Sequence, residues 1–303
     1  MNKKINFLMI AAAAALWGMI GLYSSFLSDR GYTNMQIIFL RSALTTVFMG
    51  IFLLIKDRKL FKIDIKDVWI FVGMGFLSFC MFNFFYFNAI KLNNSLSMAC
   101  ILMYTAPIFV MILSAVLFKE KITLQKNISL FLTIIGCVLV SGGNVSMTPL
   151  GLLAGLATGF GYSLYSIFGT YAVKKYSTYT STFYAFLFST IGSLFMCNPI
   201  DAVRITVQSG VNTALFLSFA VINTALPYML YTKGLEKTEA SKAIIICCVE
   251  PVVATVLGVL VLKQSVGFVS ALGMLFVFAA IAILNIKFDQ NKTAQKKGYE
   301  LSE

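Results

Sequence analysis

The chain has 303 residues, of which 59% are hydrophobic and 12% are charged, and its formal net charge is +12. Soluble domains average about 25% charged residues, so this composition excludes an ordinary soluble protein and indicates a membrane protein. Histidine is absent, which excludes the catalytic triads and zinc sites that depend on it.

Ten apolar segments follow one another along the chain, and most have the roughly 20 residues that a helix needs to cross a bilayer. The first follows Lys3 and Lys4 as a signal peptide would, but its length predicts an uncleaved first helix. The predicted fold class is all-α integral membrane, with ten transmembrane helices. The predicted spans are 5–27, 33–55, 68–90, 95–118, 126–143, 150–172, 179–197, 211–232, 240–262 and 266–287.

Lysines and arginines gather in alternate loops between these spans. Cytoplasmic loops carry an excess of such residues, so we expect a cell-membrane protein with both termini in the cytoplasm. The positive charge then reflects membrane topology, and we expect no binding to nucleic acid. The basic loops include 56–66, 119–126, 174–175 and 233–242, whereas the opposite loops contain only Arg30, Lys91, Arg204 and Lys263.

The two halves of the chain share a weak internal repeat. Pro107 and Lys119 recur, at the same spacing, as Pro251 and Lys263. The copies lie five spans apart, and an odd number of spans turns the second copy upside down in the membrane. Inverted repeats are a recurring architecture of secondary transporters. We expect a first repeat at 5–143, a second at 150–287 and a polar cytoplasmic tail at 288–303.

Short motifs in both halves have an order and spacing typical of one transporter family. They are Trp17-Gly18, Leu40-Arg41-Ser42, Ala89-Ile90, Pro107, Lys119-Glu120-Lys121, Gly234-Leu235, Glu250-Pro251 and Gly273. By these motifs the chain resembles the EamA-type transporters of the drug/metabolite transporter (DMT) superfamily over residues 5–287.

The resemblance implies ten helices in two inverted repeats, with spans one to four and six to nine around a central cavity and spans five and ten at the periphery. It also implies export or exchange of small metabolites, often amino acids, without ATP. Two positions depart from the pattern. Gln264 replaces the acidic residue expected after span nine, and Ala106 occupies the place equivalent to Glu250.

Glu250 and Arg41 are the two formal charges that lie deep within the predicted spans. At 1.5 Å per residue, Glu250 lies about 15 Å and Arg41 about 12 Å inside the membrane boundary, so a direct or water-bridged pair is compatible with their depths. In one interpretation Glu250 lines the cavity and engages a substrate ammonium, a proton or Arg41. In the other, the two residues form a buried ion pair that fixes helix packing.

Pro107 and Pro251 occupy equivalent places in the two repeats. Proline lacks an amide N–H and clashes with the preceding turn, so we expect kinks at the carbonyls of Met103 and Cys247. These kinks are either hinges for transport or static bends that improve packing.

Polar and aromatic residues at helical spacing mark a candidate cavity wall. Each alone fits packing as well as binding, but the set favours a pocket for an amphipathic or aromatic solute, with cation–π potential toward amines. The candidate binding or coupling residues besides Glu250 and Arg41 are Trp17, Asn83, Tyr104, Tyr162, Tyr165 and Tyr228.

These features predict a secondary-active exporter or exchanger of small metabolites, above all amino acids, that works by alternating access. The alternative is a proton- or gradient-coupled transporter of organic cations or quaternary amines, for drug efflux or choline-like uptake. An enzyme or a channel is disfavoured, because no acid pair, metal set or selectivity filter is visible. We expect no cofactor, metal or ATP. The expected partners are a small-molecule substrate and the lipid bilayer, and a homodimer is left open.

Overall fold

The computed structural model describes residues 3–93, 96–140, 148–262 and 267–285, and it contains helices and no strand in these ranges. The all-α class is therefore confirmed, while the tail at 288–303 lies outside the described residues. The elements are α1 (Lys3–Trp17), α2 (Ile20–Ser28), α3 (Asn34–Lys56), η1 (Arg58–Phe61), η2 (Ile65–Asp67), α4 (Val68–Val72), η3 (Gly73–Cys80), α5 (Met81–Asn93), α6 (Leu96–Met103), α7 (Ala106–Phe118), α8 (Leu124–Val140), α9 (Pro149–Ala172), α10 (Thr178–Leu194), α11 (Pro199–Val207), α12 (Gly210–Ala220), η4 (Val221–Ala225), α13 (Leu226–Leu235), α14 (Ala240–Cys247), α15 (Val249–Leu262) and α16 (Phe268–Asn285).

The described helices are long and apolar enough to make this a multi-pass membrane protein. Seven helical runs meet the length and hydropathy that a span requires, and the pair α10–α11, which bends by 109°, would be an eighth. Helices α8 and α16 are apolar but shorter. Each predicted span coincides with one of these helices, although some predicted ends lie outside the described residues. The count of ten spans stays a prediction.

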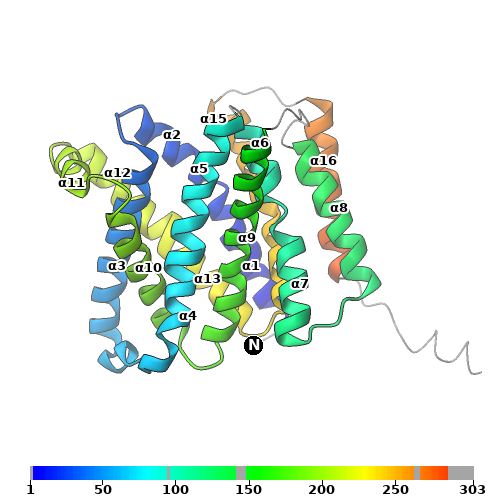
Figure 1. Cartoon of the computed structure of the whole chain (residues 1–303), viewed down its shortest axis with the longest axis horizontal. Helices are drawn as coiled ribbons and strands as arrows, with labels where there is room; N and C mark the ends of the chain where they lie inside the picture. The colour runs from blue at the N-terminus through cyan, green and yellow to red at the C-terminus, as the bar shows by residue number, and fades with distance from the viewer. Residues whose placement is uncertain (1–2, 94–95, 141–147, 263–266, 286–303) are drawn as a thin grey trace, which may run out of the picture.

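Helices of the first half pack mainly against helices of the second half (Figure 1). Helix α1 lies against α13 and α14, α3 against α10, and α5 against α9. Helices α8 and α16, which correspond to predicted spans five and ten, form a pair at one edge of the molecule. This is the peripheral position that we expected for these two spans. Their backbones touch, since a Cβ on Gly136 would lie 2.8 Å from the carbonyl oxygen of Gly273.

Five of the described spans are broken or distorted partway along their length. Breaks separate α1 from α2, α6 from α7 and α14 from α15, and the π-helical segments η3 and η4 interrupt two further spans. Pro107 and Pro251 lie in the first turns of α7 and α15. Backbone amides in a first turn have no acceptor within the helix, so the missing N–H of proline costs no hydrogen bond there. The predicted kinks are therefore breaks, and each falls just before its proline.

Polar side chains satisfy backbone carbonyls at these breaks. Asn223 in η4 donates from Nδ2 to the carbonyl of Leu16, just before the break between α1 and α2. The hydroxyl of Thr105 donates to the carbonyl of Leu102 at 2.6 Å. An unsatisfied backbone group within a bilayer costs several kcal/mol, so breaks are tolerated where the protein itself supplies partners.

A charged cluster joins the end of α7 to the start of α14. We call it the Glu120 cluster; its members are Glu120, Lys126, Glu239, Ser241 and Lys242. Glu120 accepts hydrogen bonds from the first amide of α14 at 3.0 Å and from the Ser241 hydroxyl. Lys126 Nζ, on a side chain that is 3% exposed, lies 3.3 Å from Glu120 and 2.7 Å from Glu239. Because the end of α7 meets the start of α14, the equivalent runs α6–α7 and α14–α15 are antiparallel, as inverted repeats require.

Replacing Lys126 with methionine removes the cation that Glu120 and Glu239 share, although Lys242 still pairs with Glu239. Breaking a buried pair costs about 3–5 kcal/mol, and Glu239 is partly exposed, so we expect the free energy of unfolding to fall by about 1–3 kcal/mol. Thermal unfolding in detergent measures the effect. The control is Lys121→Met, which removes an exposed lysine nearby and should leave Tm unchanged. Equal Tm values for the two variants would contradict this account.

The Glu120 cluster also makes stability depend on pH. Burial alone would raise the pKa of Glu239, but hydrogen bonds and charges from Lys126 and Lys242 lower it below its ordinary value of 4.5. The stabilisation is present above the ordinary value and is lost as the pH falls through the lowered pKa. We expect the Tm of the wild type to decrease more steeply between about pH 5 and about pH 3 than that of Glu239→Gln. Parallel pH profiles would contradict this prediction.

Candidate functional site

Arg41, on α3, is a buried cation with unused hydrogen-bonding capacity. The residue is 5% exposed, and its Nε donates to Thr224 Oγ1 in η4 at 2.7 Å. The guanidinium lies 5.1 Å from the ring centroid of Phe79 and 4.9 Å from that of Phe219. Its Nη2 has no hydrogen-bond partner among the described residues. A guanidinium in this state can bind a carboxylate or another oxygen ligand.

The π-helical segment η4 sets the orientation of this contact. The Thr224 hydroxyl donates to the carbonyl of Phe219, five residues earlier, at 3.0 Å, so its lone pairs face Arg41. The hydroxyl of Thr45, one turn after Arg41, lies 2.7 Å from the Arg41 carbonyl and 3.2 Å from the Ala220 carbonyl. Helix α3 and η4 are therefore held in a fixed register around the guanidinium.

Glu250 lies in the first turn of α15, directly after the break that follows α14. The positive end of the helix dipole stabilises a carboxylate there. Glu250 Oε2 accepts a hydrogen bond from the Tyr162 hydroxyl of α9 at 3.1 Å. Glu250 and Arg41 are near enough to attract each other, but none of the ion pairs among the described residues joins them. The direct pair that the sequence allows is therefore not formed among the described residues.

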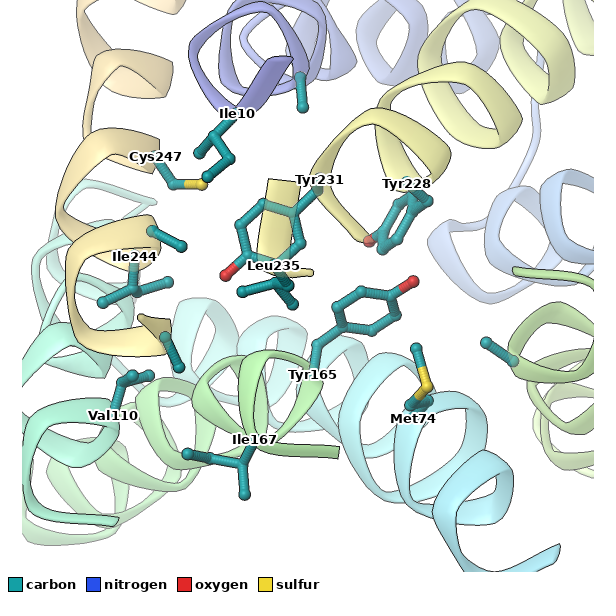
Figure 2. Packing of buried hydrophobic residues seen from close by; sticks show 14 of the residues in the cluster. Ile10, Met74, Val110, Tyr165, Ile167, Tyr228, Tyr231, Leu235, Ile244 and Cys247 are labelled. Atoms are coloured by element: carbon teal, nitrogen blue, oxygen red, sulfur yellow. The ribbon is translucent and has the colours of Figure 1, made fainter. Parts of the chain in front are cut away.

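Aromatic side chains from several helices meet around Tyr228 on α13. Its ring lies 4.9 Å from that of Trp17, 4.9 Å from that of Tyr165 and 5.8 Å from that of Phe79. Figure 2 shows the rings of Tyr165, Tyr228 and Tyr231 gathered between α9 and α13. They enclose a cavity of about 10 Å³, enough for about one water molecule. Entry of a metabolite therefore requires these rings or their helices to move.

The structure brings most of the predicted site residues together. Those that line the cavity are Trp17, Tyr162, Tyr165 and Tyr228. Tyr104 packs in the same cluster as Cys248 and Tyr162, beside the break before Glu250. Asn83 is not part of the wall, because its Nδ2 donates to the Phe79 carbonyl of its own span at 2.6 Å. That bond satisfies the amide locally.

Several residues that line the cavity are absent from the sequence-based set, among them Phe79, Phe82 and Ser166. Ser166 follows Tyr162 by one turn on α9 and shares a hydrogen bond with the Tyr231 hydroxyl, so helical spacing from Tyr162 was a usable signal. The two phenylalanines lie in and after η3. A π-helical segment changes the number of residues per turn, so α-helical spacing does not identify the inward face there.

Comparison with known proteins gives matches along almost the whole chain. The EamA-like transporter family matches twice, at residues 4–142 and 149–286. Uncharacterized transporter YxxF of Bacillus subtilis (strain 168) is 23% identical, over 100% of this chain and 96% of its own length. Uncharacterized inner membrane transporter YicL of Salmonella typhimurium is 25% identical, over 94% of this chain and 96% of its own length. A protein crystal structure with 15% identity has a TM-score of 0.76 and covers 94% of this chain and 97% of its own, which shows a shared fold.

The burial of Trp17 predicts a spectroscopic signal at the site. The chain has two tryptophans; Trp17 is 5% exposed and Trp69 is 50% exposed. We expect the Trp69→Phe variant, which reports Trp17 alone, to resist quenching by a brominated detergent. The Trp17→Phe variant reports Trp69, which lies on the outer surface of the apolar run Ile65–Asn93, and should be quenched readily. Equal quenching of the two variants would refute the buried position of Trp17.

Proposed function

The chain belongs to the EamA-like transporter family, and from this premise we propose that it is a secondary-active transporter of small metabolites, above all amino acids. It works by alternating access as an exporter or exchanger. The protein lies in the cell membrane with both termini in the cytoplasm, the orientation that the alternating lysine-rich loops favour.

One observation carries this proposal: Tyr104 and Cys248, at the breaks of two antiparallel, equivalent helix pairs, pack in one cluster with Tyr162, which lines the small cavity. Breaks within membrane spans are typical of substrate and ion sites at the interface of inverted repeats. Here α15 begins at the break with Glu250 in its first turn, and Tyr162 joins that carboxylate to the cavity wall. Pro107 and Pro251, directly after the breaks, are the proposed hinges.

The Glu120 cluster supports alternating access because it closes one end of the bundle. It links α7 of the first repeat to α14 of the second, and in the proposed orientation it lies on the cytoplasmic side.

A second substrate class is favoured by the aromatic rings of the site. The ring of Tyr228 lies 4.9 Å from those of Trp17 and Tyr165, and aromatic faces attract organic cations. Together with Glu250, such a site suits quaternary amines. Transport of organic cations is therefore the alternative to transport of amino acids.

Replacing Glu250 with glutamine should abolish transport while the protein still inserts and purifies normally. The amide keeps the size of the side chain but removes the charge that would engage a substrate ammonium or a proton. Uptake of labelled amino acid by counterflow into proteoliposomes measures the effect. The matched control is Asp201→Asn, at an exposed carboxylate on α11, which should transport as the wild type does. Wild-type transport by Glu250→Gln would refute the role of Glu250.

A further inference from the structure

Arg41 forms no direct ion pair with a described residue, although Glu250 attracts it from a distance and the Tyr228 hydroxyl lies next to it. Its Nε is bonded to a neutral hydroxyl, that of Thr224, and its Nη2 has no partner. None of the ion pairs among the described residues includes it. The flanking rings of Phe79 and Phe219 attract the cation but carry no net charge. The residue is 5% exposed, so the cost of removing its charge from water is poorly compensated until an anion binds the guanidinium.

The free guanidinium lies directly behind the cavity wall. Phe79, on which it stacks, and Tyr228 both line the cavity, and their ring centroids are 5.8 Å apart. Tyr162 also lines the cavity, and its hydroxyl donates a hydrogen bond to the Glu250 carboxylate. The cavity therefore has a cation behind one part of its wall and a carboxylate behind another, with aromatic rings between them.

We propose that Arg41 is the carboxylate-binding group of this site and that the substrate is a zwitterionic amino acid with an apolar side chain. The free side of the guanidinium binds the substrate carboxylate, the ammonium lies toward Glu250, and the side chain contacts the aromatic rings. This assignment rests on the proposed transport function and selects between its two substrate classes.

Charge complementarity separates those classes. Arg41 and Glu250 together are neutral, and a zwitterion supplies one opposite charge for each. A quaternary amine would compensate Glu250 but would add a second cation near a guanidinium that still forms no direct ion pair. Inside a protein such repulsion is much stronger than in water. The Thr224 hydroxyl does not remove it, because Thr224 is neutral.

The first test compares ligands that differ in their charged groups, using the purified full-length protein. They are L-phenylalanine, L-phenylalaninamide without the carboxylate, 3-phenylpropionate without the ammonium, and choline. Ligand-dependent shifts in Tm report binding to the folded state. We expect L-phenylalanine to bind about 10- to 100-fold more tightly than its amide, the range for a hydrogen bond to a charged group. Equal affinity for acid and amide, or binding of choline alone, overturns the proposal.

The second test assigns the preference to Arg41. In Arg41→Gln the preference for the acid over the amide should disappear, whereas the matched control Arg204→Gln, at an exposed arginine on α11, should keep it. Arg41→Lys retains the positive charge but not the planar guanidinium that can donate two parallel hydrogen bonds, so it should weaken the preference for the acid. This variant replaces Arg41→Gln in the test if Arg41→Gln does not fold. An unchanged preference in Arg41→Gln or Arg41→Lys overturns the proposal.

Counterflow in proteoliposomes separates this inference from the proposed function. Exchange of L-phenylalanine but not of its amide supports both. Exchange of choline or of the amide without exchange of L-phenylalanine leaves the transport function standing and refutes the carboxylate subsite. If none of the four solutes binds or exchanges, the proposed function and the subsite are both wrong.

Discussion

The need to pair every backbone amide and carbonyl within the bilayer is the constraint on which this architecture depends. It allows a helix to break only where other parts of the protein surround it, so the breaks of several spans meet inside the bundle. Gly18 illustrates how close they come, since a Cβ there would lie 2.9 Å from the carbonyl oxygen of Glu250. The position of Glu250 at a helix start and the Thr224 contact of Arg41 both follow from this arrangement.

The sequence predicted those features of the fold that depend on hydropathy and charge. Apolar runs located the helices, and the prolines located two of the breaks, because proline cannot sit in a helix interior without disrupting it. The π-helical segment η4 is likewise followed by a proline, Pro227 at the start of α13. The break after Trp17 and the π-helical segment η3 contain no proline, and the first depends on a partner far along the chain, the Asn223 side chain that binds Leu16.

The same distinction applies to the candidate site. Tyr162, Tyr165 and Tyr228, which were chosen by helical spacing, lie on regular helices or at the start of one, and all three line the cavity. Asn83 follows η3, where extrapolation at α-helical spacing fails, and it faces its own backbone. Predicted depth in the membrane allowed Arg41 and Glu250 to be neighbours, but depth alone does not decide contact, which depends on how α3, α9 and α15 pack.

The packing of the two halves against each other also imposes an order on biosynthesis. The chain is made from its N-terminus, and α8 is complete well before α16 exists. Until then Gly136 lacks the helix that meets it at Gly273, and Arg41 lacks the hydroxyl of Thr224. During this interval the first half lacks the helices of the second half that will cover it, and the Arg41 guanidinium contacts lipid or temporary partners instead.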